Sequence, residues 1–165
     1  MDQIAANRET IQLINGIIEA VVQRKKDIFN PIYFYGNPVS VRIAMNRLEK
    51  AYHEAHPKDQ IIHTNAVDFC AGILEAVKDG ECDAYERSFK TARLLLFESV
   101  EVLAGRNTAM DSLYRIVDVL FENGCLVVFG ALTAPRNIPS LEERNQAQME
   151  GGIICCVDMN RVDSK

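Results

Sequence analysis

Five short, mostly apolar runs alternate with segments of helical spacing, and this alternation restricts the fold more than any other feature of the sequence. The runs span residues 32–35, 60–64, 92–98, 125–130 and 153–157. The helical segments span residues 7–23, 44–55, 66–78, 83–90, 108–121 and 141–149. Arg24, Lys25 and Lys26 give the first of them a basic C-terminal end. Continuous apolar runs are typical of strands buried on both faces of a parallel sheet. The sequence therefore predicts an α/β fold, a three-layer αβα sandwich with a parallel five-stranded sheet.

Length and charge limit the organisation and the partners of the chain, which has 165 residues and a net charge of −5. One domain fits this length. No apolar run approaches the roughly 20 residues that a membrane helix needs, and the N-terminus does not read as a signal peptide. We therefore expect a cytoplasmic protein without membrane contact. The net negative charge also disfavours tight binding of nucleic acid, because affinity for nucleic acid comes largely from neutralising its phosphates.

Residue types that bind metals show no ligand-like spacing. The three histidines, His53, His56 and His63, fall on a predicted helix, a loop and a strand. No C-x-x-C pair occurs among the five cysteines, which are Cys70, Cys82, Cys125, Cys155 and Cys156. We expect reduced thiols, no metal site and no cofactor.

Residues 36–43 follow the first strand and stand where a phosphate-binding loop would lie. Such a loop reads G-x-x-x-x-G-K-[ST], and its backbone, lysine and hydroxyl hold the phosphates and Mg²⁺. Here Val41, Arg42 and Ile43 replace the second glycine, the lysine and the hydroxyl residue, and Pro38 removes one N–H group. A degenerate nucleotide-binding loop is therefore predicted, formed by Gly36, Asn37, Val41, Arg42 and Ile43.

Three stretches of the chain carry a resemblance to a known family. Residues 30–36 read NPIYFYG, residues 95–105 read LLFESVEVLAG, and residues 138–144 read IPSLEER. In this order they resemble the NPLFIYG, LLIDDIQFLAG and IPTLEDR segments of the ATPase domain of the bacterial replication initiator DnaA, a member of the AAA+ group. The resemblance implies a P-loop NTPase, RecA-like AAA+ core over residues 1–165, a single domain without the family's lid subdomain or helix-turn-helix DNA-binding domain.

Departures from that family fall on positions that carry its chemistry. Glu98 and Ser99 align with the two Walker B aspartates, which act on Mg²⁺ and on the attacking water. Residues 129–133 align with the sensor-1 segment and lose its polar contacts to the γ-phosphate, and Gln148 aligns with the arginine finger. Together with the altered loop, these replacements predict a pseudo-ATPase that is not an enzyme.

Three charged residues in these segments have a local interpretation beside the functional one. Arg42 would bind a phosphate or lie in solvent at the start of a helix, and Glu98 would approach a metal or pair locally at the end of its strand. Arg144, together with Gln148, would contact a neighbouring AAA+ subunit, or Arg144 would pair within the chain with Glu142, Glu143 or Glu150. Asp111 and Arg115, four residues apart, are expected to pair on a helix surface.

The retained scaffold and the lost chemistry predict a catalytically inactive DnaA-like domain that acts as a protein-binding regulatory module in the control of DNA replication initiation. Its partner would be an AAA+ protein such as a DnaA-type initiator, or a second copy of the chain. Alternatives are a nucleotide-binding sensor without hydrolysis and a self-associating scaffold unrelated to nucleotide. Sequence-specific DNA binding is not expected, and single-stranded DNA is disfavoured because residues 67–90 are acidic.

Overall fold

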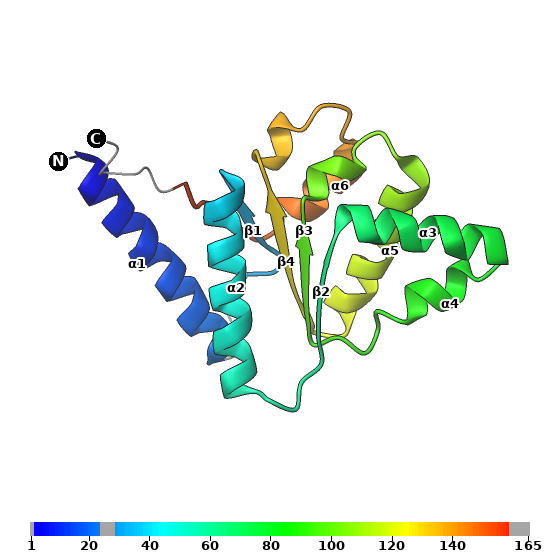
Figure 1. Ribbon diagram of the computed structural model, residues 1–165, viewed down its shortest axis with the longest axis horizontal. Coiled ribbons are helices and arrows are strands. Elements are labelled where there is room, and N and C mark those ends of the chain that lie inside the picture. Colours follow the sequence, from blue (N-terminus) through cyan, green and yellow to red (C-terminus); the bar gives the residue numbers. More distant parts are fainter. Residues whose placement is uncertain (1, 24–28, 159–165) are drawn as a thin grey trace.

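A five-stranded, entirely parallel sheet forms the centre of the computed structural model, which describes residues 2–23 and 29–158 (Figure 1). Its spatial order is β2-β3-β4-β1-β5. The strands are β1 (Ile32–Tyr35), β2 (Ile61–Asn65), β3 (Leu94–Glu98), β4 (Leu126–Ala131) and β5 (Ile153–Cys156). This arrangement confirms the predicted α/β fold with a parallel five-stranded sheet.

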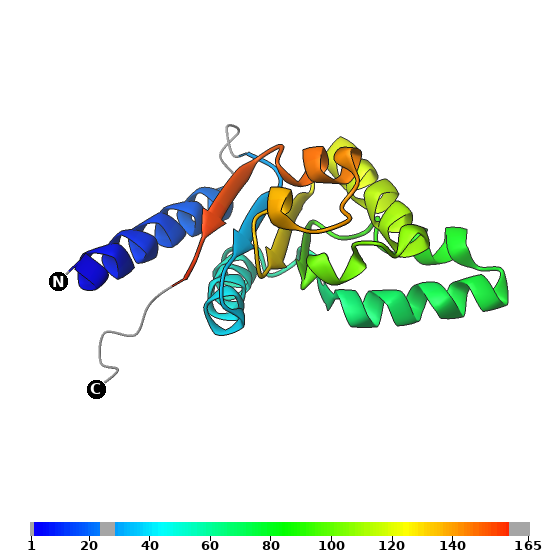
Figure 2. The ribbon, with the colours of Figure 1, turned by 90° about the horizontal axis from the view of Figure 1, so that it is seen from above.

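Helices cover both faces of the sheet, as Figures 1 and 2 show. One face carries α1 (Asp2–Val22) and α2 (Pro38–Ala55). The other face carries α3 (Ala66–Asp79), α4 (Cys82–Arg87), α5 (Asn107–Glu122) and α6 (Glu143–Met149). Short 3₁₀ turns, η1 (Val100–Leu103) and η2 (Pro135–Asn137), follow β3 and β4. No helix in the described part of the chain is long and apolar enough to cross a membrane.

Successive side chains of each strand enter different cores, because they point to opposite faces of the sheet. Tyr33 and Phe129 pack with α3 and α5, whereas Phe34 and Val128 pack with α1 and α2. All four are fully buried. Burial on both faces explains why these strands read as continuous apolar runs in the sequence.

The second helix begins earlier than its sequence pattern indicated, at Pro38 rather than at residue 44. Asn37 is its N-cap, and the Asn37 side chain accepts a hydrogen bond from the Ser40 N–H. Proline suits the first turn of a helix because its missing N–H group is not needed there. The segment expected to be an open loop is therefore helical. Arg24, Lys25 and Lys26, the expected basic end of the first helix, lie outside the described residues.

Candidate functional site

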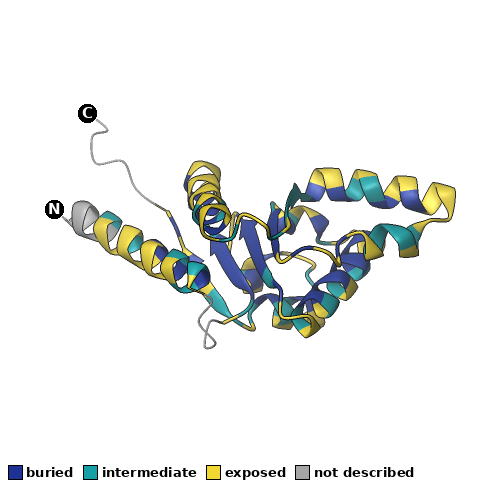
Figure 3. Cartoon of the chain, turned by 90° about the horizontal axis from the view of Figure 1, so that it is seen from below, coloured by how far each residue is buried: buried dark blue, intermediate teal, exposed yellow. Residues whose placement is uncertain are grey.

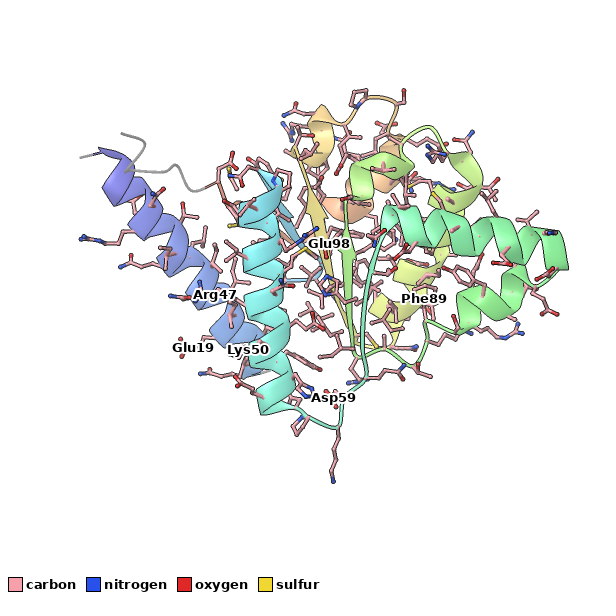
Figure 4. All side chains as sticks on the ribbon, viewed as in Figure 1. Glu19, Arg47, Lys50, Asp59, Phe89 and Glu98 are labelled. Carbon is pink, nitrogen blue, oxygen red and sulfur yellow. The ribbon has the colours of Figure 1, made fainter. Side chains whose placement is uncertain are left out.

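The candidate site lies at the edge of the sheet where β1, β3 and β4 end. Strands of a parallel sheet all end at the same edge, which is where ligands bind in open α/β sheets. The Gly36 N–H donates to the Ala131 carbonyl at 3.1 Å and so joins the ends of β1 and β4. Glu98, the last residue of β3, lies at this edge beside α2 (Figure 4).

Backbone N–H groups of the first turn of α2 are already engaged within the chain. The Ser40 N–H donates to Asn37 Oδ1 at 2.8 Å, and the Val41 N–H donates to the Asn37 carbonyl at 3.0 Å. The Val41 side chain is buried against β4, where a Cβ atom on Gly130 would come within 2.9 Å of it. Asn37 is thus the acceptor for amides that a phosphate-binding loop would direct at its ligand.

A small cavity of about 60 Å³ separates this turn from the ends of β3 and β4. Pockets that hold drug-sized ligands are larger, roughly 300–1,000 Å³. A nucleotide therefore requires movement of the surrounding residues. The cavity is lined by Pro38, Val41, Arg42, Glu98, Ser99, Glu101, Gly130, Ala131 and Leu132.

Glu98 has two partners within the chain. Its carboxylate lies 2.5 Å from Nε2 of His63 on β2 and 3.8 Å from Nε of Arg42 on α2. The other ring nitrogen of His63 lies 2.6 Å from the carboxylate of Glu49, also on α2. This chain of contacts ties α2, β2 and β3 together beside the cavity. Sequence reasoning missed His63 and Glu49, because nothing local connects them to Glu98.

Ser99 and Glu101 shape the turn that follows β3. Ser99 has the left-handed backbone conformation, with φ 59° and ψ 41°, which few residues other than glycine adopt. The Glu101 carboxylate accepts a hydrogen bond from the Leu132 N–H at 3.3 Å and thereby joins this turn to the end of β4. Glu101 is a second acidic residue that lines the cavity, and sequence reasoning missed it. Its position, three residues after Glu98, could have indicated that it lies at the same edge of the sheet.

Tyr33 on β1 adds a polar contact to the segment that follows β4. Its hydroxyl donates to the Thr133 carbonyl at 2.7 Å. Burial, reinforced by the nearby charge of Glu101, raises the pKa of Tyr33 above its usual range. The ring therefore stays a neutral donor that fixes the segment after β4.

Arg144 and Gln148 meet around Tyr114 rather than at the cavity. The Arg144 guanidinium pairs with Asp111, lies 3.9 Å from a Glu142 carboxylate oxygen and lies 4.7 Å from the centre of the Tyr114 ring. The Gln148 amide donates to the Tyr114 carbonyl at 3.1 Å. About half of the Arg144 side chain stays exposed. The structure therefore places both residues on the surface formed by α5 and α6.

Metal-ligating side chains do not gather anywhere in the described ranges in groups of three or more that could hold an ion. All five cysteines are free thiols.

Comparison with known proteins identifies the family. A family model of the bacterial DnaA ATPase domain matches residues 7–156. The chromosomal replication initiator protein DnaA of Francisella tularensis subsp. novicida (strain U112) is 24% identical over 139 residues. That alignment covers 84% of this chain and 28% of the relative, so the chain spans little more than a quarter of that protein.

Solved structures share the fold at low sequence identity. Domain III of the Thermotoga maritima replication initiation protein DnaA has a TM-score of 0.81 and 15% identity, with 88% of this chain and 61% of that chain covered. A replication initiator DnaA bound to AMPPCP and single-stranded DNA has a TM-score of 0.77 and 20% identity, with 90% and 46% covered.

The family match corrects one prediction. The chain was expected not to be an enzyme, on the basis of the replaced residues in the loop, at Glu98 and Ser99, in the sensor-1 segment at residues 129–133, and at Gln148. That prediction is wrong, because the family whose model matches is an ATPase domain family. Replacement of individual motif residues does not exclude a chain from the family. Since the match extends over nearly all of the sequence, the chain belongs to the bacterial DnaA ATPase domain family.

Proposed function

We propose that this chain acts in the initiation of DNA replication, in the cytoplasm, as a regulatory module that binds another AAA+ protein such as a DnaA-type initiator. Family membership supports the link with replication initiation. The observation that carries protein binding is an exposed row of apolar side chains on α3. We call this row the α3 stripe; its members are Val67, Leu74 and Val77, with the half-buried Cys70 between them.

The α3 stripe lies on one face of its helix, because its members are spaced by three, four and three residues. Val67 is 65% exposed, Leu74 is 71% exposed and Val77 is 53% exposed. The adjacent face of α3, about 100° around the helix from the stripe, buries Phe69 and Ile73 in the core. Figure 3 shows the exposed outer side of α3 over its buried inner side. Contiguous exposed apolar side chains typically mark an interaction site.

The surroundings of the α3 stripe indicate the chemistry of its partner. A groove of about 290 Å³ runs between Leu74 and the start of α5 at Asn107. Lys78 on α3 lies beside the stripe and Arg106 lines the groove, whereas the exposed carboxylates of Asp68, Glu75 and Asp79 lie on the far side of the helix. An apolar ridge with a carboxylate at its rim complements the groove, because opposite charges at a rim favour correct association. The carboxylates on the far side of α3 oppose the phosphates of DNA.

Arg144 and Gln148 are candidates for a second contact with a neighbouring AAA+ subunit. Arg144 is half-exposed, and its side chain is held in place by Asp111 and the Tyr114 ring. Binding would therefore cost little additional side-chain entropy. Its planar guanidinium suits a carboxylate or phosphate on the partner.

Binding is tested with the purified chain and the DnaA-type initiator of the same cell, by surface-immobilised titration. Leu74→Glu should weaken the complex at least about tenfold, because an anchor side chain of an interface is lost and a charge is buried. Leu13→Glu on α1 changes another exposed leucine, which is 51% exposed and lies away from α3, and should leave affinity unchanged. Absence of binding by the unmodified chain would contradict the proposal. A concentration-dependent dimer in light scattering would favour self-association instead.

A second candidate function is nucleotide binding at the turn formed by Gly36, Asn37, Val41, Arg42 and Ile43. The observation that favours it is Arg42, whose side chain is 72% exposed at the mouth of the cavity and 3.8 Å from Glu98. Isothermal titration with ATP and Mg²⁺ tests binding, and phosphate release in the same sample tests the hydrolysis expected of an ATPase family. No saturable heat at millimolar ATP would exclude this candidate.

A further inference from the structure

Asp158, the residue that follows β5 and Val157, lies against the start of the loop after β1. The Val157 N–H donates to the Tyr35 carbonyl at 2.8 Å, which extends the pairing of β5 with β1 by one residue. This bond carries the chain past the end of β1 and places Asp158 beside Gly36. Two segments about 120 residues apart in sequence therefore meet at the candidate site.

The Asp158 carboxylate contacts Asn37 twice. Its Oδ1 atom accepts from the Asn37 backbone N–H and, at 3.0 Å, from the Asn37 side-chain amide. Gly36 makes this approach feasible, because a Cβ atom at this position would collide with the carboxylate. Gly36 also has φ 143°, a conformation that other residues rarely adopt. An anion thus already occupies the entrance of the loop.

Asn37 connects this carboxylate to the first turn of α2. The same side chain that donates to Asp158 accepts from the Ser40 N–H, and the Asn37 carbonyl accepts from the Val41 N–H. Fixing Asn37 therefore fixes the helical course of residues 38–41. A negative charge at the N-terminus of a helix also stabilises that turn through the helix dipole.

We propose that Asp158 and Asn37 form a latch that keeps the phosphate loop closed, with the Asp158 carboxylate in the place of a ligand phosphate. Phosphate and carboxylate oxygens compete for the same N–H donors. A phosphate-bearing ligand must displace Asp158 and open the first turn of α2, which also enlarges the 60 Å³ cavity. The latch shares the premise of the second candidate function, that this loop takes such a ligand.

Asp158→Ala tests the latch, with Asp79→Ala as the matched control that removes an exposed aspartate at the end of α3. The probes are ATP with Mg²⁺ and, separately, inorganic pyrophosphate, each titrated calorimetrically into the full chain. Opening the loop should lower the Kd of Asp158→Ala about tenfold relative to the unmodified chain and the control, since a larger fraction of molecules is competent to bind. Amide hydrogen exchange at Asn37, Val39 and Ser40 should also become faster.

The possible results of the titrations distinguish the latch from nucleotide binding itself. Equal affinity of the unmodified chain and Asp158→Ala overturns the latch while nucleotide binding stands. Absence of binding by every variant overturns both. Tighter binding by Asp158→Ala together with unchanged binding by Asp79→Ala supports the latch, and unchanged amide exchange at Asn37 and Ser40 overturns it even then.

Discussion

The Nε2 atom of His63 lies 2.5 Å from a carboxylate oxygen of Glu98, across neighbouring strands of the sheet. The Nδ1 atom of the same ring lies 2.6 Å from Glu49 on α2. The ring of His63 therefore bridges Glu98 at the end of β3 and Glu49 on α2, and so joins the helix to the sheet beside the cavity.

His63→Ala should lower the free energy of unfolding by about 1–2 kcal/mol, because the partly buried carboxylates of Glu98 and Glu49 each lose a hydrogen-bond partner. His53→Ala is the control, since His53 is exposed near the end of α2 and should change stability by less than about 0.5 kcal/mol. Urea unfolding at pH 7 measures both. Equal effects of the two substitutions would show that the link adds nothing to stability.

Glu86 makes stability depend on acidic pH. Two hydrogen bonds from Arg115 lower the pKa of the Glu86 carboxyl below its ordinary value of 4.5, against the opposing effect of burial. A lowered folded-state pKa means that this stabilisation is fully present above pH 4.5 and is lost as the pH falls through the lowered value.

Arg115→Gln should therefore destabilise the protein by about 0.5–1 kcal/mol at pH 7, since the arginine is more than half exposed. The difference from the unmodified protein should shrink as the pH approaches 3. Thermal unfolding followed between pH 3 and pH 7 measures the effect. A constant difference across that range would contradict the assigned cause.

Gly130 sets the close approach of α2 to β4. A Cβ atom at this position would lie 2.6 Å from the Met45 sulfur and 2.9 Å from a Val41 methyl group, so Gly130→Ala should cost about 1–3 kcal/mol through overpacking. Gly16→Ala in α1 meets nothing within 4 Å and should stabilise by about 0.5–1 kcal/mol. Denaturant titration compares the two; a neutral Gly130→Ala would mean that α2 shifts freely.

Cys155 and Cys156 should differ in reactivity although they are adjacent. Burial raises the pKa of the Cys155 thiol to about 11, whereas the Cys156 side chain is exposed. Of these two thiols, iodoacetamide at pH 8 should therefore label only Cys156 in the native protein and both in urea. Fragment mass spectrometry reads the site, and Cys156→Ser should abolish native labelling of that peptide. Native labelling at Cys155 would show that β5 opens readily.

Much of the fold could be predicted from the sequence, because it depends on local patterns. The apolar runs at residues 92–98 and 125–130 can be satisfied only by burial on both faces, so a parallel sheet between helices followed directly. The NPIYFYG segment at residues 30–36 indicated the family. The early start of α2 was also encoded locally, since Asn37 followed by Pro38 is a helix-start signal.

The tertiary structure alone decided which polar groups meet. Local spacing favoured a pair between Asp111 and Arg115, yet Arg115 pairs with Glu86 on α4 and Asp111 pairs with Arg144. The contacts of His63 with Glu98 and of Asp158 with Asn37 likewise join distant segments. Such pairs depend on strand register and on the rotation of packed helices, whereas sequence spacing specifies only neighbours within one element.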